Sequence, residues 1–415
     1  MVDVMKLQLK NMGPINEANI NINKITIVGG HNATGKSTLS KFLYSFLRSN
    51  SFNRQEIAYG SILNLIMNET RYIRRIFKKN SIEFRYPFFR LRNVDDFEMI
   101  LERYEKMKTF IYDSNISEED FHDIKSRLDV IDDLINVVDE DSDELYISLM
   151  RNLLESEFSS NNFNCYIDIN NEFTIDFKNY DFEDDNAFKS SNQLVVNDIF
   201  YIDSVSILDT FEQDRFFDRK AIDHFESLKK NLTCKTTDVF DKKINQNILD
   251  IEKEINQIIN GKFFYERGEF KFISNNNIKS NMSNTASGTK QIGLIQLLLA
   301  NRKLKENSFL IIDEPEVNLH PDWQYKLAKI LVLLAKRLNI SIYINTHSPL
   351  FIESVHAFSY YYDVLDKTTY HLAKLSENNL FDINEIDESN LSEIYSNLGQ
   401  AYIDIDILRL EKDLD

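Results

Sequence analysis

The sequence has few cysteines and no long apolar run, and each absence excludes a class of protein. Its two cysteines, Cys165 and Cys234, lie far apart and outside any C-x-x-C or Cys/His spacing. We therefore expect neither a disulfide framework nor a zinc site, and a reducing cytoplasm as the location. The N-terminus lacks an apolar signal core, and no apolar run approaches the length of a membrane span, so we expect no membrane segment.

Basic residues are outnumbered by acidic ones, 48 against 66, so the net charge is −18 at pH 7. This balance argues against a surface that is broadly attractive to nucleic-acid phosphates. The segment Arg71–Arg92 is an exception: it carries eight basic residues against the single acid Glu83, a net +7 that leaves −25 for the rest of the chain. Six aromatic residues are interleaved with these bases. The segment could bind nucleic acid or an acidic partner, or it could be a solvated helix face followed by a half-buried strand.

The segment Gly30–Ser37 fits the phosphate-binding loop pattern G-x-x-x-x-G-K-[ST]. A short β-branched run, Ile25–Val28, precedes it as a predicted strand, and apolar residues at helical spacing follow it. Such a loop lets backbone N–H groups approach the β-phosphate of ATP, with Lys36 on the β/γ oxygens and Ser37 on Mg²⁺. The predicted nucleotide-binding residues are Gly30, His31, Asn32, Ala33, Thr34, Gly35, Lys36, Ser37 and Thr38.

A second apolar strand, Phe309–Asp313, ends in the acidic pair Asp313-Glu314, the pattern of a Walker B element. We expect Asp313 to hold magnesium through water and Glu314 to orient and polarise the attacking water. A further strand, Ile342–Asn345, leads to His347, which falls where another strand end should meet the γ-phosphate.

Two other elements separate this chain from other phosphate-loop proteins. Ser287-Gly288-Thr289-Lys290 opens an apolar helix, and a serine at a helix start makes an anion site. After the acidic pair, Glu316–Pro321 is predicted to turn into a helix that begins near Asp322.

The chain length of 415 residues favours one large domain with an insertion, or two domains. Two antiparallel strands, near residues 6–12 and 18–22, are predicted ahead of the loop strand. Between the loop helix and a strand at 195–202 no nucleotide motif occurs, so residues 51–192 are interpreted as an insertion that is mainly helical and contains a hairpin at 165–177. We expect Ile244–Ile259 to form a helix that packs on its own domain and is closed by Gly261, followed by a hairpin at 263–272. The predicted domains are 1–50, 51–192, 193–365 and 366–415.

The order of these motifs resembles ABC-type ATPases of the branch that includes SMC heads, RecF and OLD-type proteins. The resemblance implies an α/β fold: antiparallel N-terminal strands, a mixed parallel sheet flanked by helices, and here a largely helical insertion. It implies that Ser287, Gly288, Thr289 and Lys290 act in trans on the ATP of a second copy, with Asn318 and His320 in the inter-subunit turn. It makes His347 the switch histidine, groups it with Glu314 and Lys36 as catalytic, and assigns Asp203 to the glutamine-loop position as a further metal ligand.

The chain also departs from that family. The signature reads Ser-Gly-Thr-Lys where much of the family has Ser-Gly-Gly, Asp203-Ser204 stands where a glutamine is expected, and the long coiled-coil arm of SMC proteins is missing. Small armless members of this branch are frequent in bacterial anti-phage defence systems, and this chain resembles their ATPase subunits. The resemblance therefore implies a cytoplasmic, Mg²⁺-dependent ATPase that pairs head to tail around two ATP molecules and controls a separate effector.

Two alternatives remain open from the sequence. A RecF-like or SMC-like repair ATPase would bind DNA through Arg71–Arg92, which salt dependence would reveal. An OLD-like nuclease would need a C-terminal metal site, for which only Asp404-Ile405-Asp406 is available, after predicted strands at 358–364 and 369–374. These acids are interpreted instead as the surface of a final acidic helix.

Overall fold

The fold is described from a computed structural model of the chain, which divides into two compact units, Met1–Phe52 with Leu154–Asp415, and Asn53–Leu153. The residues that the structure describes are 5–51, 54–84, 97–138, 143–158, 164–169, 173–178, 181–182, 196–203, 222–233, 246–266, 269–281, 285–400, 404–405 and 407. Each unit is described by itself.

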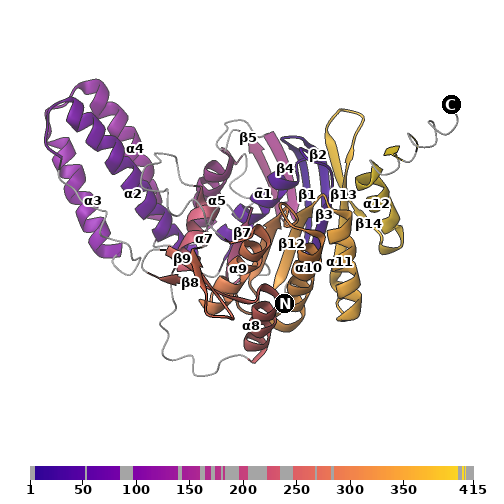
Figure 1. Cartoon of the computed structure of the whole chain (residues 1–415). Helices are drawn as coiled ribbons and strands as arrows, with labels where there is room; N and C mark the ends of the chain where they lie inside the picture. Colours follow the sequence, from indigo (N-terminus) through magenta and orange to yellow (C-terminus); the bar gives the residue numbers. More distant parts are fainter. Residues whose placement is uncertain are drawn as a thin grey trace. The chain divides into compact units, whose positions relative to one another are not determined.

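The first unit is built on a mixed sheet that has eleven strands among the described residues, in the order β6-β5-β4-β1-β2-β14-β13-β3-β12-β11-β7 (Figure 1). The N-terminal strands β1 (Met5–Met12) and β2 (Ile15–Ile22) are antiparallel, as predicted. The strands that carry the sequence motifs are parallel: β3 (Ile25–Gly29), β12 (Ser341–Thr346), β11 (Phe309–Asp313) and β7 (Ile199–Ile202). Their residues are buried, as expected for strands covered on both faces.

Two strands from the C-terminal part of the chain complete the middle of this sheet. Strand β13 (Thr368–Leu375) lies parallel to β3, and β14 (Phe381–Ile386) lies parallel to β2. The predicted strand at 369–374 is thus confirmed, whereas the one predicted at 358–364 is wrong, because α11 (Pro349–Tyr361) covers most of it as a helix. Apolar residues that read as a buried strand are equally suited to a buried helix face.

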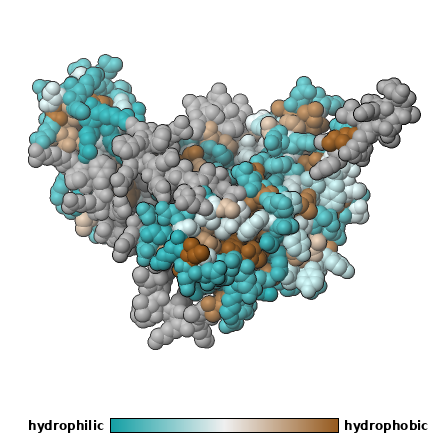
Figure 2. All heavy atoms as spheres, in the orientation of Figure 1, coloured by the Kyte–Doolittle hydropathy of each residue, from teal (hydrophilic) through white to brown (hydrophobic). Residues whose placement is uncertain are grey.

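Helices cover both faces of the parallel strands. Helix α1 (Lys36–Ser49) contacts β7, β11 and β12 on one face. On the other face, alternate strand residues such as Ile27, Ile312 and Ile344 enter one large apolar core. The helices that contribute to that core are α7 (Asp223–Thr233), α8 (Gln246–Ile259), α9 (Ser287–Ala300), α10 (Pro321–Leu338), α11 and α12 (Leu391–Leu398). The fold class predicted from the sequence is therefore confirmed. The face of the molecule seen in Figure 2 is largely hydrophilic where it is coloured.

Helix α8 packs on its own domain, as predicted from its isoleucine stripe, since Ile248, Ile251, Ile255 and Ile259 lie in the same core. It ends differently from the prediction: Asn260 takes the left-handed conformation, with φ 53°, and Gly261 already begins a strand. The predicted hairpin follows as part of a three-stranded sheet formed by β8 (Gly261–Glu266), β9 (Glu269–Ser274) and β10 (Lys279–Asn281). Helix α7 (Asp223–Thr233) precedes α8 in this unit.

The predicted hairpin near 165–177 is present, but it belongs to the main sheet. Strand β4 (Asn164–Ile169) pairs with β5 (Phe173–Lys178) and also with β1, and β6 (Asp181–Phe182) extends the edge. The sequence pattern predicted the two strands but not the pairing of β4 with β1, because pairing between strands that are distant in sequence leaves no local signal.

The second unit is helical. Its helices α2 (Arg54–Lys79), α3 (Phe97–Tyr112) and α4 (Glu118–Val138) share a core that includes Ile66, Tyr104 and Leu128. Ser117 caps α4, because its hydroxyl accepts a hydrogen bond from the N–H of Asp120 at 3.2 Å. Helix α5 (Asp143–Phe158) follows it in the chain and crosses the boundary into the first unit.

Among the helices of the described residues, none is long and apolar enough to cross a lipid bilayer.

Candidate active site

The phosphate-loop segment joins β3 to α1, as the sequence predicts. The Lys36 ammonium is buried, and it donates hydrogen bonds to the carbonyls of Gly30, at 2.8 Å, and His31, at 2.6 Å. Thr34 fixes the loop from within, since its hydroxyl donates to the His31 carbonyl at 2.9 Å. Gly30 and Gly35 are buried, whereas His31, Asn32, Ala33 and Ser37 are exposed and Thr38 is partly so.

The two glycines of the loop are required by its geometry. Gly35 has φ +93°, and a Cβ atom there would lie 2.5 Å from Ile15 Cγ1. A Cβ atom on Gly30 would lie 2.8 Å from Ala373 Cβ on β13. The loop backbone is therefore clamped between the N-terminal strands and β13, which holds its N–H groups in place.

Acidic residues surround Lys36 electrostatically. Burial lowers the pKa of its ammonium, and the nearby carboxylates of Glu314, Asp313 and Glu316 oppose that shift. A buried ammonium and the loop N–H groups can bind the phosphates of ATP. The nearby carboxylates would repel those phosphates unless a cation such as Mg²⁺ is bound with them.

Parallel strand register brings the second acidic element to the same edge of the sheet. Asp313 is the partner of Asn345 across β11 and β12, and Thr346 is the partner of Gly29 across β12 and β3. The loop is attached directly to this edge, because the Gly30 N–H donates to the Thr346 carbonyl at 3.3 Å. Since the carboxyl ends of parallel strands meet at one edge, motifs more than 280 residues apart become neighbours.

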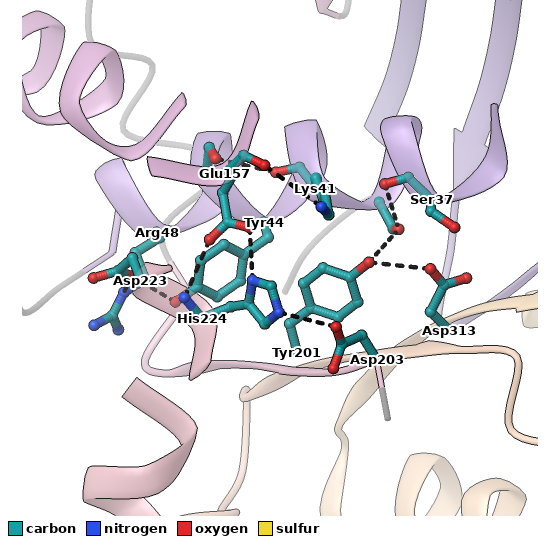
Figure 3. A network of polar contacts seen from close by, with 12 residues as sticks. Ser37, Lys41, Tyr44, Arg48, Glu157, Tyr201, Asp203, Asp223, His224 and Asp313 are labelled. Atoms are coloured by element: carbon teal, nitrogen blue, oxygen red, sulfur yellow. Dashed lines mark hydrogen bonds and ion pairs between the residues drawn. The ribbon is translucent and has the colours of Figure 1, made fainter. Parts of the chain in front are cut away.

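Asp313 is almost fully buried, and both of its carboxylate oxygens accept hydrogen bonds. The Tyr201 hydroxyl donates to Oδ2 at 3.2 Å, and the Asn345 amide donates to Oδ1 at 3.0 Å. The Tyr201 hydroxyl also lies 3.0 Å from the Ser40 hydroxyl of α1. The contact between Tyr201 and Asp313 is drawn at the right of the network in Figure 3. Sequence reasoning missed Tyr201, Ser40 and Asn345, which carry no motif.

Glu314 and His347 meet at the open side of the site. Glu314 has a left-handed backbone, with φ 48°, and its N–H donates to the Asn345 carbonyl at 2.9 Å. His347 Nδ1 lies 3.8 Å from Glu314 Oε1, and the two side chains are 37% and 33% exposed. The pair that the sequence predicts at the γ-phosphate is thus adjacent and accessible, next to buried Asp313.

A third carboxylate, that of Glu316, binds the backbone and side chains at the end of β12, next to His347. It is buried, and its Oε1 accepts hydrogen bonds from the Thr346 hydroxyl at 2.7 Å and the His347 N–H at 2.6 Å. The same oxygen lies 3.1 Å from His347 Nδ1. Burial raises the pKa of Glu316, and these hydrogen bonds offset part of that rise. The sequence pattern placed Glu316 only in a turn, and the available signal was a third acid two residues beyond Glu314.

The predicted signature and the predicted inter-subunit turn lie against each other. A Cβ atom on Gly288 would lie 2.9 Å from the Trp323 ring, so the start of α9 packs directly on the start of α10. Thr289 and Lys290 are buried, and the side chain of Ser287 lies outside the described residues. In the turn, Asn318 is exposed with φ 61°, and His320 caps α10 by accepting the Asp322 N–H at 3.3 Å.

Asp203, which is predicted to be a metal ligand, forms an ion pair with His224. Its Oδ2 lies 3.3 Å from His224 Nε2, and Nδ1 of the same imidazole lies 2.6 Å from Glu157 Oε2 (Figure 3). Burial by itself lowers the pKa of His224, but Asp203 and Glu157 outweigh it and raise that pKa to about 9. The metal role expected for Asp203 therefore competes with a buried ion pair, and it stays a prediction.

The residues at the loop fit Mg²⁺ and ATP by their chemistry. A hard cation prefers oxygen ligands, and the Ser37 hydroxyl and the Asp313 and Glu314 carboxylates supply them. Within the described residues no group of three or more His, Cys, Asp or Glu side chains is arranged so that it could hold a metal ion without further ligands. Of the Asp404-Ile405-Asp406 pair, Asp404 accepts a hydrogen bond from Gln400 at 2.9 Å, and Asp406 lies outside the described residues.

A protein-family model described as "AAA ATPase domain" matches residues 4–352, most of the chain. The chain belongs to this family. It is therefore an ATPase of the AAA class. No curated protein sequence matches it.

Several solved structures are similar to this AAA ATPase at low sequence identity. The SMC head domain from Thermotoga maritima has 11% identity and a TM-score of 0.39, and the match covers 92% of this chain and 99% of that one. An SmcHead bound to the C-winged helix domain of ScpA has 10% identity and a TM-score of 0.40, covering 94% and 100%. An Smc head domain with an extended coiled coil, bound to the C-terminal domain of ScpA derived from Pyrococcus furiosus, has 9% identity and a TM-score of 0.36, covering 95% and 98%.

Proposed function

We propose that this ATPase is a switch whose two copies pair head to tail around two ATP molecules, and that hydrolysis releases the pair. Each copy would present Ser287–Lys290 to the ATP held by Gly30–Thr38 of the other, with Asn318 and His320 at the contact. A partner protein could then read the oligomeric state as a report of bound nucleotide.

The chemical roles follow from the positions of the side chains. Lys36 leaves its two loop carbonyls for the β/γ oxygens, and Glu314 takes the proton of the attacking water as general base. His347 lies beside Glu314 and can hydrogen-bond the γ-phosphate, while Glu316 holds the His347 backbone. Ser37, and Asp313 through water, would hold Mg²⁺, which would neutralise phosphate charge.

The exposure of the reactive pair carries the proposal. Glu314 and His347 are about one-third exposed, while the residues that support them, Asp313, Glu316 and Thr346, are buried. A site of phosphoryl transfer works best when bulk water is excluded. A second copy that covers the loop would close this open side and add the helix N-terminus of α9 to the γ-phosphate.

The test uses Glu314→Gln, which removes the base but keeps the shape of the side chain. We expect this variant to bind ATP, to lose turnover by at least about 100-fold, and to sediment as a dimer or larger assembly with ATP and Mg²⁺. Glu377→Gln, in an exposed loop between β13 and β14, is the matched control and should keep turnover and exchange of subunits.

A second variant separates dimerisation from nucleotide binding. Ser287→Arg should abolish both turnover and ATP-dependent sedimentation while a fluorescent ATP analogue still binds. If Glu314→Gln stays monomeric with ATP and Mg²⁺, and Ser287→Arg hydrolyses ATP at the wild-type rate, the head-to-tail model is wrong.

The resemblance to anti-phage ATPase subunits, together with the missing arm, supports a separate effector in bacterial antiviral defence as the reader of this switch. Affinity purification of Glu314→Gln with ATP, from the native host, would identify it. Recovery of no partner in either nucleotide state, by quantitative mass spectrometry, would count against effector control.

DNA binding is a second candidate, because α2 presents exposed bases on one face. Arg71, Arg74, Arg75, Lys78 and Lys79 are all exposed and recur at helical spacing, although Lys79 lies 3.8 Å from Asp120. Arg85, Arg90 and Arg92 lie outside the described residues. DNA affinity that falls steeply with salt, and that Arg71→Glu with Arg75→Glu abolishes, would favour this function; no binding at low salt would remove it.

A further inference from the structure

Four buried polar side chains form a closed ring beneath the nucleotide loop. Asp313 accepts from Tyr201 and Asn345, and both of those side chains also contact the Ser40 hydroxyl, at 3.0 Å and 3.1 Å. Ser40, Tyr201 and Asn345 are at most 1% exposed. The ring joins α1, which follows the loop, to three neighbouring strands.

The two hydrogen bonds to Asp313 have one consistent arrangement of protons. An ionised Asp313 can only accept, so the single proton of Tyr201 points to its Oδ2. The two protons of the Asn345 amide point to Asp313 Oδ1 and Ser40 Oγ. The Ser40 hydroxyl has two acceptors in reach, the Tyr201 oxygen at 3.0 Å and the Ser37 carbonyl at 3.2 Å. Either choice leaves both donors on Asp313, which fixes the orientation of the carboxylate.

The fold holds Tyr201 rigidly in this position. Its ring packs against the His224 ring, with centroids 4.6 Å apart, and against the Tyr44 ring, at 5.9 Å. On its strand it is the partner of Ile311, two residues before Asp313, so both side chains lie on the face covered by α1. Figure 3 shows the Tyr201 hydroxyl pointing toward the Asp313 carboxylate.

We propose that Tyr201, with Ser40, is a positioning residue that orients Asp313 toward the magnesium ion of MgATP. This inference rests on the proposed function. Ser40 lies one turn after Ser37, and its Oγ is 3.2 Å from the Ser37 carbonyl. The ring therefore sets the position of Asp313 relative to the start of α1, where Ser37 offers the second oxygen.

Loss of the Tyr201 hydroxyl should weaken the binding of the metal ion and leave metal-free nucleotide binding unchanged. The partners that orient a metal-binding carboxylate commonly change metal affinity or activity by about 10–100-fold when they are removed. Lys36 and the loop N–H groups do not contact Tyr201 in any hydrogen bond given above, so metal-free nucleotide binding should persist.

A second tyrosine offers a matched control. Tyr343 on β12 is also a partner of Ile311, on its other side, and is fully buried. Its hydroxyl has no hydrogen-bond partner among the described residues. Tyr201→Phe and Tyr343→Phe therefore each delete one buried hydroxyl from the same face of the sheet, and only the first breaks the ring.

The experiment measures binding of a fluorescent, non-hydrolysable ATP analogue in EDTA and across a Mg²⁺ titration, with a Mn²⁺ titration followed by electron paramagnetic resonance. For Tyr201→Phe we expect unchanged binding in EDTA and a half-saturating metal concentration about tenfold higher or more. Tyr343→Phe should stay within about twofold of wild type. Ser40→Ala should shift the metal dependence in the same direction as Tyr201→Phe, and it replaces that variant if the phenylalanine protein does not fold.

Each contrary result has a distinct meaning. Equal metal dependence of Tyr201→Phe and wild type overturns the inference, as does an equal shift in Tyr343→Phe or weakened binding in EDTA. A wild-type protein that binds no ATP analogue overturns the proposed function, and the inference falls with it.

Discussion

The buried imidazole of His224 should make the stability of the first unit depend on pH in the alkaline range. Its Nδ1 lies 2.6 Å from Glu157 Oε2, and its Nε2 lies 3.3 Å from Asp203 Oδ2. Glu157 also accepts the backbone N–H of His224 at 3.1 Å. With both carboxylates in place, the protonated imidazole is the favoured form, and its pKa is about 9.

The direction and size of the effect follow from that pKa. A histidine whose pKa is raised on folding stabilises the fold fully below its ordinary pKa of 6.5, and the contribution is lost as the pH rises through about 9. At about 1.4 kcal/mol for each pH unit between those values, the loss is roughly 3 kcal/mol. Deprotonation leaves two carboxylates around a neutral, buried ring.

The assay is urea unfolding from pH 6 to pH 10, followed by the fluorescence of Trp323, which is the single tryptophan of the chain and lies in the same unit. The wild-type free energy of unfolding should fall by roughly 3 kcal/mol between pH 6.5 and pH 9. His224→Gln should be less stable at pH 7 and should lose most of this pH dependence.

The control is His356→Gln, which changes a half-buried histidine whose Nδ1 contacts the Tyr370 hydroxyl at 3.0 Å. This variant should keep the wild-type pH dependence. The reasoning about His224 is refuted if His224→Gln and wild type lose stability in parallel from pH 6.5 to pH 9, or if NMR titration places the imidazole pKa near 6.5.

Two further substitutions test the loop and its support. Gly35→Ala should abolish binding of an ATP analogue and cost about 1–3 kcal/mol, because φ is +93° and the new Cβ would lie 2.5 Å from Ile15; Gly60→Ala, where a Cβ meets nothing within 4 Å, should leave binding unchanged. Glu316→Gln should raise the melting temperature at pH 7, because burial raises the pKa of that carboxyl and its ionised form therefore destabilises the fold above pH 4.5, yet turnover should fall about tenfold as His347 loses a charged neighbour. For Glu316→Gln, a melting temperature below that of wild type, together with unchanged turnover, would contradict the expectation.

Local patterns predicted much of the fold and part of the site. The loop, the strands around it and the helix at Ser287 are features of contiguous residues, and each forms where its period and glycines indicate. Partner choice among strands was not predictable in the same way, since β4 joins β1 and β14 joins β2 across long separations. Tyr201 and Glu316 were missed for a related reason: their roles come from neighbours on other elements.

The position of β13 and β14 between β3 and β2 has a consequence for synthesis on the ribosome. The loop strand β3 is complete once residue 29 has been added, but its neighbours β12 and β13 are made more than 300 residues later. Until then β3 has unpaired backbone edges, which are prone to wrong pairing and aggregation. The nucleotide site of this chain can therefore assemble only after β12 and β13 have been synthesised, and nascent chains stopped before residue 368 should depend on chaperones to remain in solution.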